Sequence, residues 1–85
     1  MVECIVNTCE AVAKRILDLC QQNNLTINGI SNISGIPPMT VYSMLYQKSK
    51  NPGIVNIKKL CDGFGITLSD FFDTPEFNNL EQEIK

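Results

Sequence analysis

The sequence has 85 residues, of which 44% are hydrophobic and 19% charged, and its formal net charge is -2. A chain of this length forms one small domain with a thin core. No apolar run approaches the roughly 20 residues that cross a membrane, and the N-terminus lacks an apolar stretch long enough for a signal peptide. We therefore expect a cytoplasmic protein, in which the cysteines remain thiols.

The charges are unevenly distributed along the chain. Residues 19–61, the acid-free window, contain no Asp or Glu, and their charged side chains are Lys48, Lys50, Lys58 and Lys59. Residues 1–18 hold three acids and two bases, and residues 62–85 hold six acids and one base. Because binding depends on the local field rather than on the average charge, the window predicts a polyanionic partner.

A first helix is predicted from a capping box at Asn7 and Glu10 to about Gln22. Apolar residues recur along it at spacings of three and four, as one helical face requires: Cys9, Val12, Ala13, Ile16, Leu19 and Cys20. Asn23-Asn24 ends this helix, because Asn tolerates the left-handed conformation.

A second, short helix is predicted from the N-cap Thr26 to Ser34, with Ile30 and Ile33 buried and a turn at Gly35-Ile36. Pro38 suits the first position of a third helix, where a missing N–H is harmless. The third helix is expected to turn Val41, Met44 and Leu45 inward. Its outer side is expected to carry Met39, Tyr42, Ser43 and Tyr46.

A fourth helix follows Asn51-Pro52-Gly53 and ends at Gly65. Its expected buried side comprises Ile54, Ile57, Leu60, Cys61 and Phe64. Thr67 and Asp70 begin a fifth helix that carries Leu68, Phe71 and Phe72 into the core. Thr74-Pro75 begins an acidic last helix with a sparse apolar stripe, formed by Phe77, Leu80 and Ile84.

Two short helices joined at Gly35 form a helix-turn-helix. The order and spacing of the residues resemble the Cro/C1-type (XRE) regulators. The matching residues are Leu25-Thr26, Ile30-Ser31, Gly35-Ile36, Thr40-Val41, Met44, Asn51-Pro52, Ile57, Leu60 and the GITLSDFF run at 65–72. The resemblance covers about residues 12–72. It implies an all-α, five-helix DNA-binding domain at residues 1–73, with a short additional C-terminal helix at 74–85.

The resemblance also implies a partner and a mode of binding. Members of this family are bacterial or phage regulators that often bind a two-fold site on double-stranded DNA as homodimers. The second helix of the motif lies in the major groove, and the first crosses the backbone. We therefore expect a repressor-like regulator that braces helix 26–34 on the backbone and reads bases with helix 37–47.

The resemblance also indicates which residues of this chain occupy the family's functional positions. Its base-reading positions fall on Pro38, Met39, Tyr42 and Ser43. Thr26 and Ile27 fall where the first helix of the motif touches phosphate, and Tyr46, Lys48 and Lys50 fall in the loop that lies along the backbone in this family. We also expect backbone contacts from Thr40 and, after Lys48 and Lys50, from Lys58 or Lys59, of which Lys59 is preferred. The family commonly has Gln, Arg, Asn or Ser at the reading positions, whereas this chain has Pro and Met there.

Two interpretations of this departure remain open. In the first, Met39 and the Pro38 ring contact thymine methyl groups and Tyr42 and Ser43 supply hydroxyls, with part of the specificity coming from groove shape. In the second, Met39, Tyr42 and Tyr46 form a protein-contact patch, as in an antitoxin-like interaction module. The acid-free window favours DNA, because only a surface that faces phosphates has reason to exclude carboxylates.

The C-terminal residues Phe77, Leu80 and Ile84 either fold back on the core or pair with a second subunit, since two half-sites require a dimer. The four cysteines, Cys4, Cys9, Cys20 and Cys61, lack paired CxxC spacing, and the chain has no histidine. They are interpreted as small hydrophobic residues rather than metal ligands, the alternative being a thiol sensor at Cys4 and Cys9. No catalytic motif, cofactor site or small-molecule site is recognisable, so we do not expect an enzyme.

Overall fold

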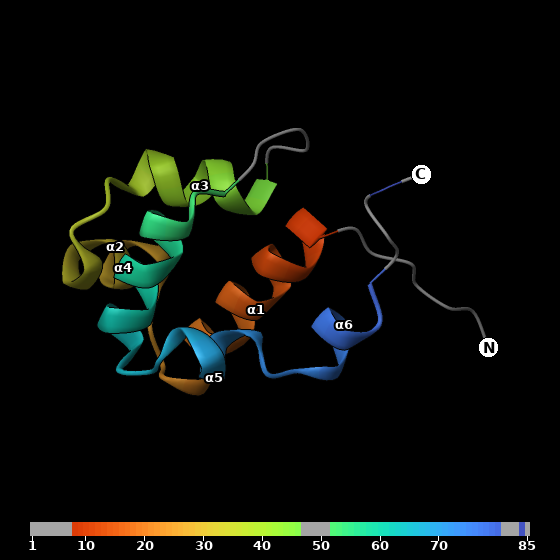
Figure 1. Cartoon of the computed structure of the whole chain (residues 1–85). Helices are drawn as coiled ribbons and strands as arrows, with labels where there is room; N and C mark the ends of the chain where they lie inside the picture. The colour runs from red at the N-terminus through yellow and green to blue at the C-terminus, as the bar shows by residue number, and fades with distance from the viewer. Residues whose placement is uncertain (1–7, 47–51, 81–83, 85) are drawn as a thin grey trace.

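Six helices and their connections form the described part of the chain. The computed structural model describes residues 8–46, 52–80 and 84. The helices are α1 (Thr8–Gln22), α2 (Ile27–Ser34), α3 (Pro38–Tyr46), α4 (Ile54–Phe64), α5 (Leu68–Phe72) and α6 (Pro75–Asn78) (Figure 1). No strand occurs among these residues, so the prediction of an all-α fold is confirmed. None of the described helices is both long and apolar enough to cross a bilayer.

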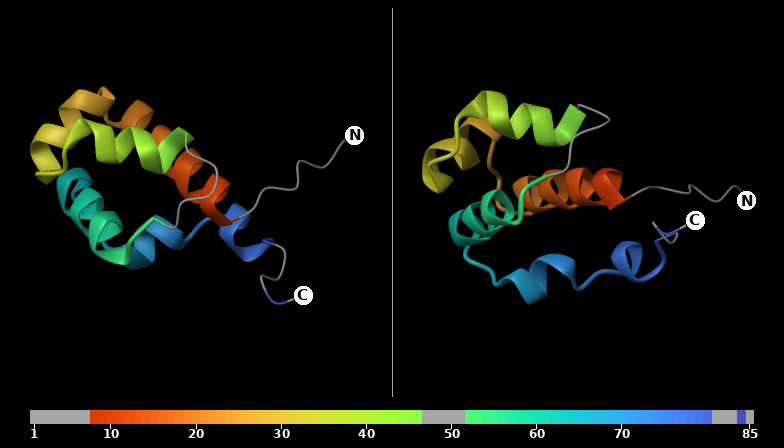
Figure 2. Two further views of the ribbon diagram at one scale, coloured as in Figure 1. Left: turned by 90° about the horizontal axis from the view of Figure 1, so that it is seen from above. Right: turned by 45° about the horizontal axis from the view of Figure 1, so that its top comes forward.

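The helices are arranged in three tiers. In Figure 1, α3 lies along the upper edge, α5 and α6 lie along the lower edge, and α1 and α4 lie between them. Helix α1 contacts α3 above and α6 below, while α2 packs on both α3 and α4, and α4 packs on α5. The second view in Figure 2 preserves this order, with α3 and α5–α6 on opposite sides.

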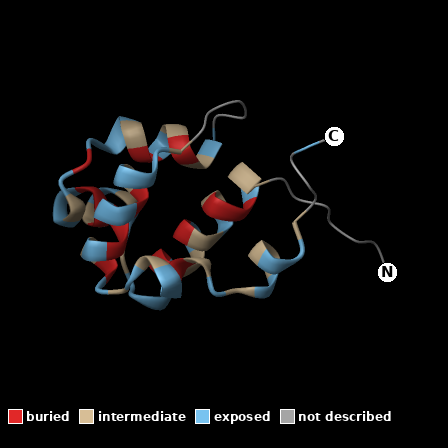
Figure 3. Cartoon of the chain, in the orientation of Figure 1, coloured by how far each residue is buried: buried red, intermediate tan, exposed pale blue. Residues whose placement is uncertain are grey.

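The hydrophobic core lies between the tiers and contains residues of five helices and of the turn between α2 and α3. Its buried members are Val12, Ile16, Leu19, Cys20, Ile30, Ile36, Val41, Met44, Ile57, Leu60, Cys61, Phe64 and Phe71. Figure 3 shows these buried positions on the inner sides of the helices. Most of the expected apolar faces are therefore confirmed.

The predicted N-caps at Thr26 and Thr67 are confirmed. The Thr26 hydroxyl accepts a 3.0 Å hydrogen bond from the backbone N–H of Gly29 at the start of α2. Thr67 and Asp70 form a complete capping box at the start of α5, which satisfies two backbone N–H groups that have no partner within the helix. Asn7, the proposed cap of α1, lies outside the described residues.

The predicted helix ends adopt the left-handed conformation. The backbone φ angle is 56° at Asn24, 73° at Gly35 and 77° at Gly65. At Gly35 this reversal brings the N–H groups of Gly35 and Ile36 to the carbonyl of Ser31, at 3.0 and 3.2 Å. Backbone hydrogen bonds therefore stabilise the turn between α2 and α3 and hold the direction in which the chain enters α3.

Two expected core residues, Ile33 and Ile54, are 57% exposed. Ile33 lies on α2 where this helix closely approaches Gly63 of α4; a Cβ built at Gly63 would lie 3.0 Å from Ile30 Cδ1 and 3.4 Å from Ile33 Cγ2. The inner position on α2 is instead taken by Ser31, whose hydroxyl donates to the Ile27 carbonyl at 2.8 Å. Ile54 is the first residue of α4 and lies beyond the packed part of that helix.

The last helix is shorter than the sequence predicted. Helix α6 ends at Asn78, and Asn79 is its C-cap, because Asn favours helix ends over helix interiors. Phe77 packs on its own core, with ring centroids 4.9 Å from Phe72 and 6.1 Å from Phe71. Leu80 follows the helix half-buried, and Ile84 is 87% exposed. These three residues do not form one helical stripe.

Two basic side chains of α1 hold the lower tier. The Arg15 guanidinium donates to the carbonyls of Phe71 and Asp70, both at 2.8 Å, and lies 6.0 Å from the centre of the Phe71 ring. Lys14 reaches Asp18 at 3.1 Å and Glu76 at 3.4 Å. Arg15 thereby satisfies carbonyls at the end of α5, and Lys14 links α6 to α1.

These contacts shift the pKa of two exposed groups. The pKa of Lys14 is raised, first by its hydrogen bond to Asp18 and then by Glu76. The pKa of Glu76 is lowered, first by a backbone N–H at the start of α6 and then by Lys14. The buried thiols of Cys20 and Cys61 have raised pKa values because burial penalises the thiolate, so both remain neutral hydrophobic residues near pH 7.

Candidate nucleic-acid interface

Helix α3 packs on the core along one side and begins at two consecutive prolines, Pro37 before the helix and Pro38 at its first position. Val41 is fully buried and Met44 nearly so. The Pro37 carbonyl accepts hydrogen bonds from the N–H groups of Thr40 and Val41, at 2.9 and 3.3 Å. Pro38 is the first residue of the helix, where its missing N–H costs nothing. The helix is therefore fixed to the core along one side, and its other side faces outward.

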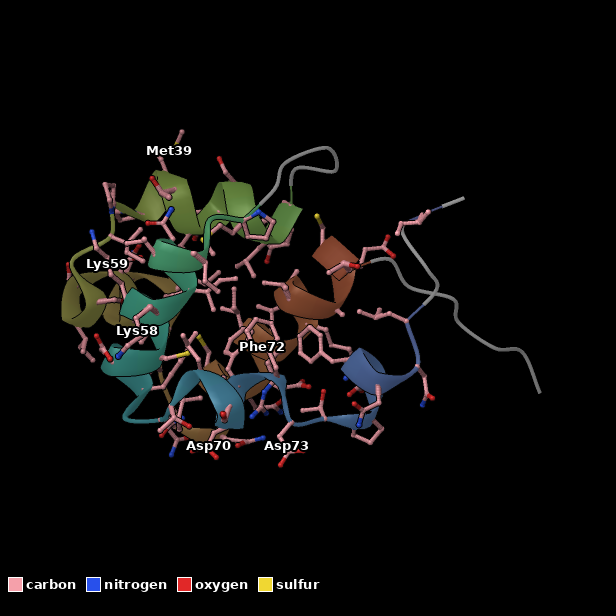
Figure 4. The ribbon with its side chains drawn as sticks, viewed as in Figure 1. Met39, Lys58, Lys59, Asp70, Phe72 and Asp73 are labelled. Carbon is pink, nitrogen blue, oxygen red and sulfur yellow. The ribbon has the colours of Figure 1, made fainter. Side chains whose placement is uncertain are left out.

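The outward side of α3, which we term the α3 face, comprises Pro38, Met39, Tyr42, Ser43 and Tyr46. Met39 is 78% exposed, Tyr46 62% and Tyr42 42%, while Pro38 is exposed and Ser43 half-buried. The rings of Tyr42 and Tyr46 stack at 6.0 Å between centroids with an interplanar angle of 26°. In Figure 4, Met39 stands at the upper edge of the molecule and points away from it.

Neither α2 nor α3 contains a charged residue. The carboxylates of the described residues lie on α1, at Asp62 near the end of α4, and in the segment from Asp70 to Glu76. Asp70 and Asp73 mark the lower edge in Figure 4, opposite Met39. Helices α2 and α3, which lie within the acid-free window, therefore carry no carboxylate, and α3 is the outermost helix along the upper edge.

The predicted backbone-contacting residues are only partly described by the structure. Thr26 is exposed at the start of α2, with its hydroxyl engaged as the cap, and Thr40 is half-buried on α3. Lys48 and Lys50, the first choices for phosphate contact, lie outside the described residues. Lys59 is exposed on α4.

The structure separates two lysines that are adjacent in the sequence. Lys58 forms an ion pair with Asp62, one helical turn further along α4. Lys59 forms no ion pair with any residue that the structure describes. In Figure 4, Lys59 lies on the upper side of α4, nearer α3, and Lys58 lies lower, toward α5. Of the two, Lys59 has the charge available for a partner on the α3 side.

Helix α2 carries two exposed amides that were not among the predicted site residues. Asn28 and Asn32 are both exposed, and their spacing of four places them on one side of the helix. That spacing, on a helix with no charged residue, was a signal that could have identified them. Their side chains add hydrogen-bonding groups beside Thr26 in the first helix of the motif.

A family model for the Cro/C1-type helix-turn-helix DNA-binding domain matches residues 15–76. The chain belongs to this family. The α2–turn–α3 unit is its helix-turn-helix, as the sequence resemblance predicted, and the family is one of DNA-binding domains rather than of enzymes. Within the described residues, no group of three or more Cys, Asp or Glu side chains is placed to hold a metal ion.

Two curated transcriptional regulators are similar to this chain. The chain is 32% identical over 66 residues to the HTH-type transcriptional regulator PuuR of Escherichia coli (strain K12), and equally to that of Shigella flexneri. These matches cover 78% of this chain but 35% of each relative, so the chain spans about a third of the length of the curated relatives it matches.

A solved structure matches nearly the whole fold. The crystal structure of the prophage Lp1 protein 11 superposes with a TM-score of 0.79 at 37% sequence identity, covering 89% of this chain and 100% of that one. The overall architecture of this domain is therefore similar to that of a prophage protein.

Proposed function

We propose that this Cro/C1-type domain is a repressor-like transcriptional regulator that places α3 in the major groove of duplex DNA and braces α2 against the backbone. The observation that carries the proposal is the α3 face itself, which is exposed, uncharged and outermost on the acid-free side. A carboxylate here would repel phosphates. The carboxylates instead occupy α1, the end of α4, and the lower tier.

The proposed base-contacting residues are Pro38, Met39, Tyr42 and Ser43. In a helix-turn-helix, base edges are contacted by the N-terminal residues of the second helix, and Pro38 and Met39 occupy the first turn of α3. Tyr42 and Ser43 follow one turn later on the same side. Tyr46, at the C-terminal end of α3, is proposed to reach the backbone.

The proposed phosphate contacts come from three elements. Thr26 lies at the start of α2, Thr40 on α3, and Lys59 on the upper side of α4, while Lys48 and Lys50 follow α3 in the sequence. Each lysine that neutralises a phosphate releases a counterion and adds about 0.9 to the slope of log affinity against log salt concentration. Binding should therefore weaken steeply as salt rises.

A second protomer is part of the proposal, because a two-fold site requires two reading helices about 34 Å apart. Of the three residues proposed for the interface, Phe77 packs within its own chain, which leaves Leu80 and Ile84 to meet a partner. The variant Leu80→Ser, Ile84→Ser should become monomeric when its mass is measured in solution. A variant that stayed dimeric would remove the C-terminal segment from the interface.

Selection of bound duplexes from a random pool at two salt concentrations tests the function directly. The proposal predicts enrichment of a two-fold sequence motif, with affinity that falls as salt rises. Lack of enrichment even at low salt would contradict it and would favour the antitoxin-like protein-interaction module instead, for which the exposed Met39, Tyr42 and Tyr46 would form the contact patch.

A further inference from the structure

The α3 face lacks the side chains that usually distinguish bases. Bidentate recognition of guanine requires Arg or Lys, and that of adenine requires Asn or Gln. None of these occurs from Pro38 to Tyr46. The polar side chains of α3 are the hydroxyls of Thr40, Tyr42, Ser43 and Tyr46, and a hydroxyl donates or accepts according to its neighbour. Hydrogen bonds from this helix therefore carry little base information.

The N-terminal end of α3 instead presents an exposed apolar surface. Met39 is 78% exposed, more than Tyr42 or Tyr46 on the same helix, and Pro38 before it is also exposed. A methionine side chain is unbranched and polarizable, and it adapts its shape to an apolar partner. In Figure 4 this side chain projects outward from the N-terminal half of α3, the part that meets base edges in a helix-turn-helix.

The major groove contains one apolar group that such a side chain can recognise. Thymine differs from the other bases by a methyl group on C5, which projects into the groove and contacts apolar side chains. 5-Methylcytosine carries the same methyl at the same ring position. Uracil pairs like thymine but has no methyl. The chemistry of Met39 thus points to the 5-methyl group rather than to one particular base.

We propose that this domain reads pyrimidine 5-methyl groups in duplex DNA through Met39 and the Pro38 ring. The inference rests on the proposed function. It adds that sequence preference comes mainly from methyl contacts, so that a 5-methylcytosine substitutes for thymine at the position facing Met39. DNA methylation at that position would then strengthen binding instead of blocking it.

The experiment uses a duplex enriched from the random pool, resynthesised with deoxyuridine in place of each thymidine in turn. Burial of one methyl group is worth about a fourfold change in affinity, so one thymine in each half-site should show about that loss. At the same position, a 5-methylcytosine–guanine pair should bind about fourfold more tightly than an unmethylated cytosine–guanine pair.

Two variants test whether the difference in affinity between thymine and uracil duplexes depends on the Met39 side chain. Met39→Ala should remove the difference between thymine and uracil while leaving the fold intact, because the residue is 78% exposed; circular dichroism checks the fold. Leu17→Ala is the matched control, since Leu17 is a 40% exposed apolar residue on α1, outside the motif. That variant should retain the fourfold difference.

The possible results separate the inference from the function on which it rests. Tight, salt-dependent binding of an enriched duplex with no loss at any uracil position would overturn methyl reading and leave the DNA-binding proposal standing. Equal binding of 5-methylcytosine and cytosine duplexes would also overturn it. A uracil effect that persisted in Met39→Ala would overturn its assignment to Met39. Absence of any duplex binding would overturn both proposals.

Discussion

The upper and lower tiers of this domain use polar groups in opposite ways. At the lower tier, Arg15 of α1 is bound to two carbonyls of α5, and Lys14 of α1 is bound to two carboxylates, Asp18 and Glu76 of α6. Helix α3 in the upper tier and the adjoining α2 have no charged side chain, and the nearby Lys59 forms no ion pair with a described residue. The contacts of Arg15 and Lys14 lie within the chain, whereas the polar groups of α3 and the charge of Lys59 are available to bind a partner.

This difference separates stability from recognition. Substitutions in the lower tier should change the free energy of unfolding because they break contacts within the chain. Substitutions on the α3 face should change binding and leave stability nearly unaltered, because exposed side chains there contribute little to packing. The following predictions test that separation, from the largest expected effect to the smallest.

Phe71→Ala should give the largest loss of stability. Phe71 is fully buried and packs against Phe72 and Phe77, and removal of a buried Phe costs about 3–5 kcal/mol. That is a large part of the roughly 5–15 kcal/mol that stabilises a small domain. Urea unfolding followed by circular dichroism measures the loss. Met39→Ala is the control and should unfold at the same urea midpoint as the original protein. A large shift of that midpoint in Met39→Ala would contradict the separation of stability from recognition.

Arg15→Ala should cost less than the loss of Phe71. The substitution leaves the part-buried Phe71 carbonyl without its guanidinium donor, and an unsatisfied, partly buried polar group costs about 1–3 kcal/mol. The exposed Asp70 carbonyl loses the same donor but keeps the N–H of Asp73. The same unfolding measurement applies. Arg15→Lys, which keeps the charge but loses the fork of donors, should recover only part of the stability. Full recovery by Lys would show that charge alone, rather than the paired hydrogen bonds, holds α5.

Lys59→Ala and Lys58→Ala form a matched pair for binding. Lys59→Ala should weaken binding to all duplexes and lower the salt slope by about 1. Lys58 is engaged by Asp62, so its removal should change the slope much less. Fluorescence anisotropy over a range of salt concentrations measures both. The reverse ranking would place the DNA on the side of α4 that faces α5.

Glu76→Gln should have the smallest effect, and the effect should depend on pH. Because the folded pKa of Glu76 is lowered, its contribution is present at neutral pH and is lost as pH falls through that pKa. Because the pKa of Lys14 is raised, the contribution of Lys14 to stability is lost only as pH rises through that pKa in the alkaline range. Between the pKa of Glu76 and that of Lys14, both side chains are charged and the ion pair is intact. Both groups are exposed, so the effect is small and screened by salt.

Unfolding midpoints at neutral and acidic pH measure this last effect. The original protein should exceed Glu76→Gln slightly at neutral pH, and the two should converge once Glu76 is protonated. Asp73→Asn is the control, because Asp73 is exposed and forms no ion pair with any described residue. A neutral-pH loss in Asp73→Asn equal to that in Glu76→Gln would point to general charge effects instead of the contact with Lys14.

Local sequence signals predicted much of this fold. The capping residues Thr26 and Thr67 and the left-handed ends at Gly35 and Gly65 were predictable, because each depends on residues within one helical turn. The end of the last helix was not, because the apolar spacing of Phe77, Leu80 and Ile84 outweighed the signal from Asn78 and Asn79.

Tertiary neighbours account for the other differences. Ile33 has the right spacing for burial, but the inner position on α2 is taken by Ser31, whose hydroxyl bonds to the Ile27 carbonyl. Arg15 finds its acceptors on α5, more than fifty residues away, which no local pattern shows. Lys58 and Lys59 look equivalent in sequence and differ only once α4 is placed between the tiers. Of the candidate site, the exposure of Met39, Tyr42 and Tyr46 was predictable from helical spacing alone.

Nuclear magnetic resonance titration of the isotope-labelled protein with an enriched duplex tests the central claim most directly, because it reports on both tiers at once. If the α3 face binds DNA, the largest chemical-shift changes should occur in α3, at the start of α2 and around Lys59. The amides of α5 and α6 should change little. Changes concentrated on α5 and α6, with α3 unaffected, would contradict the account.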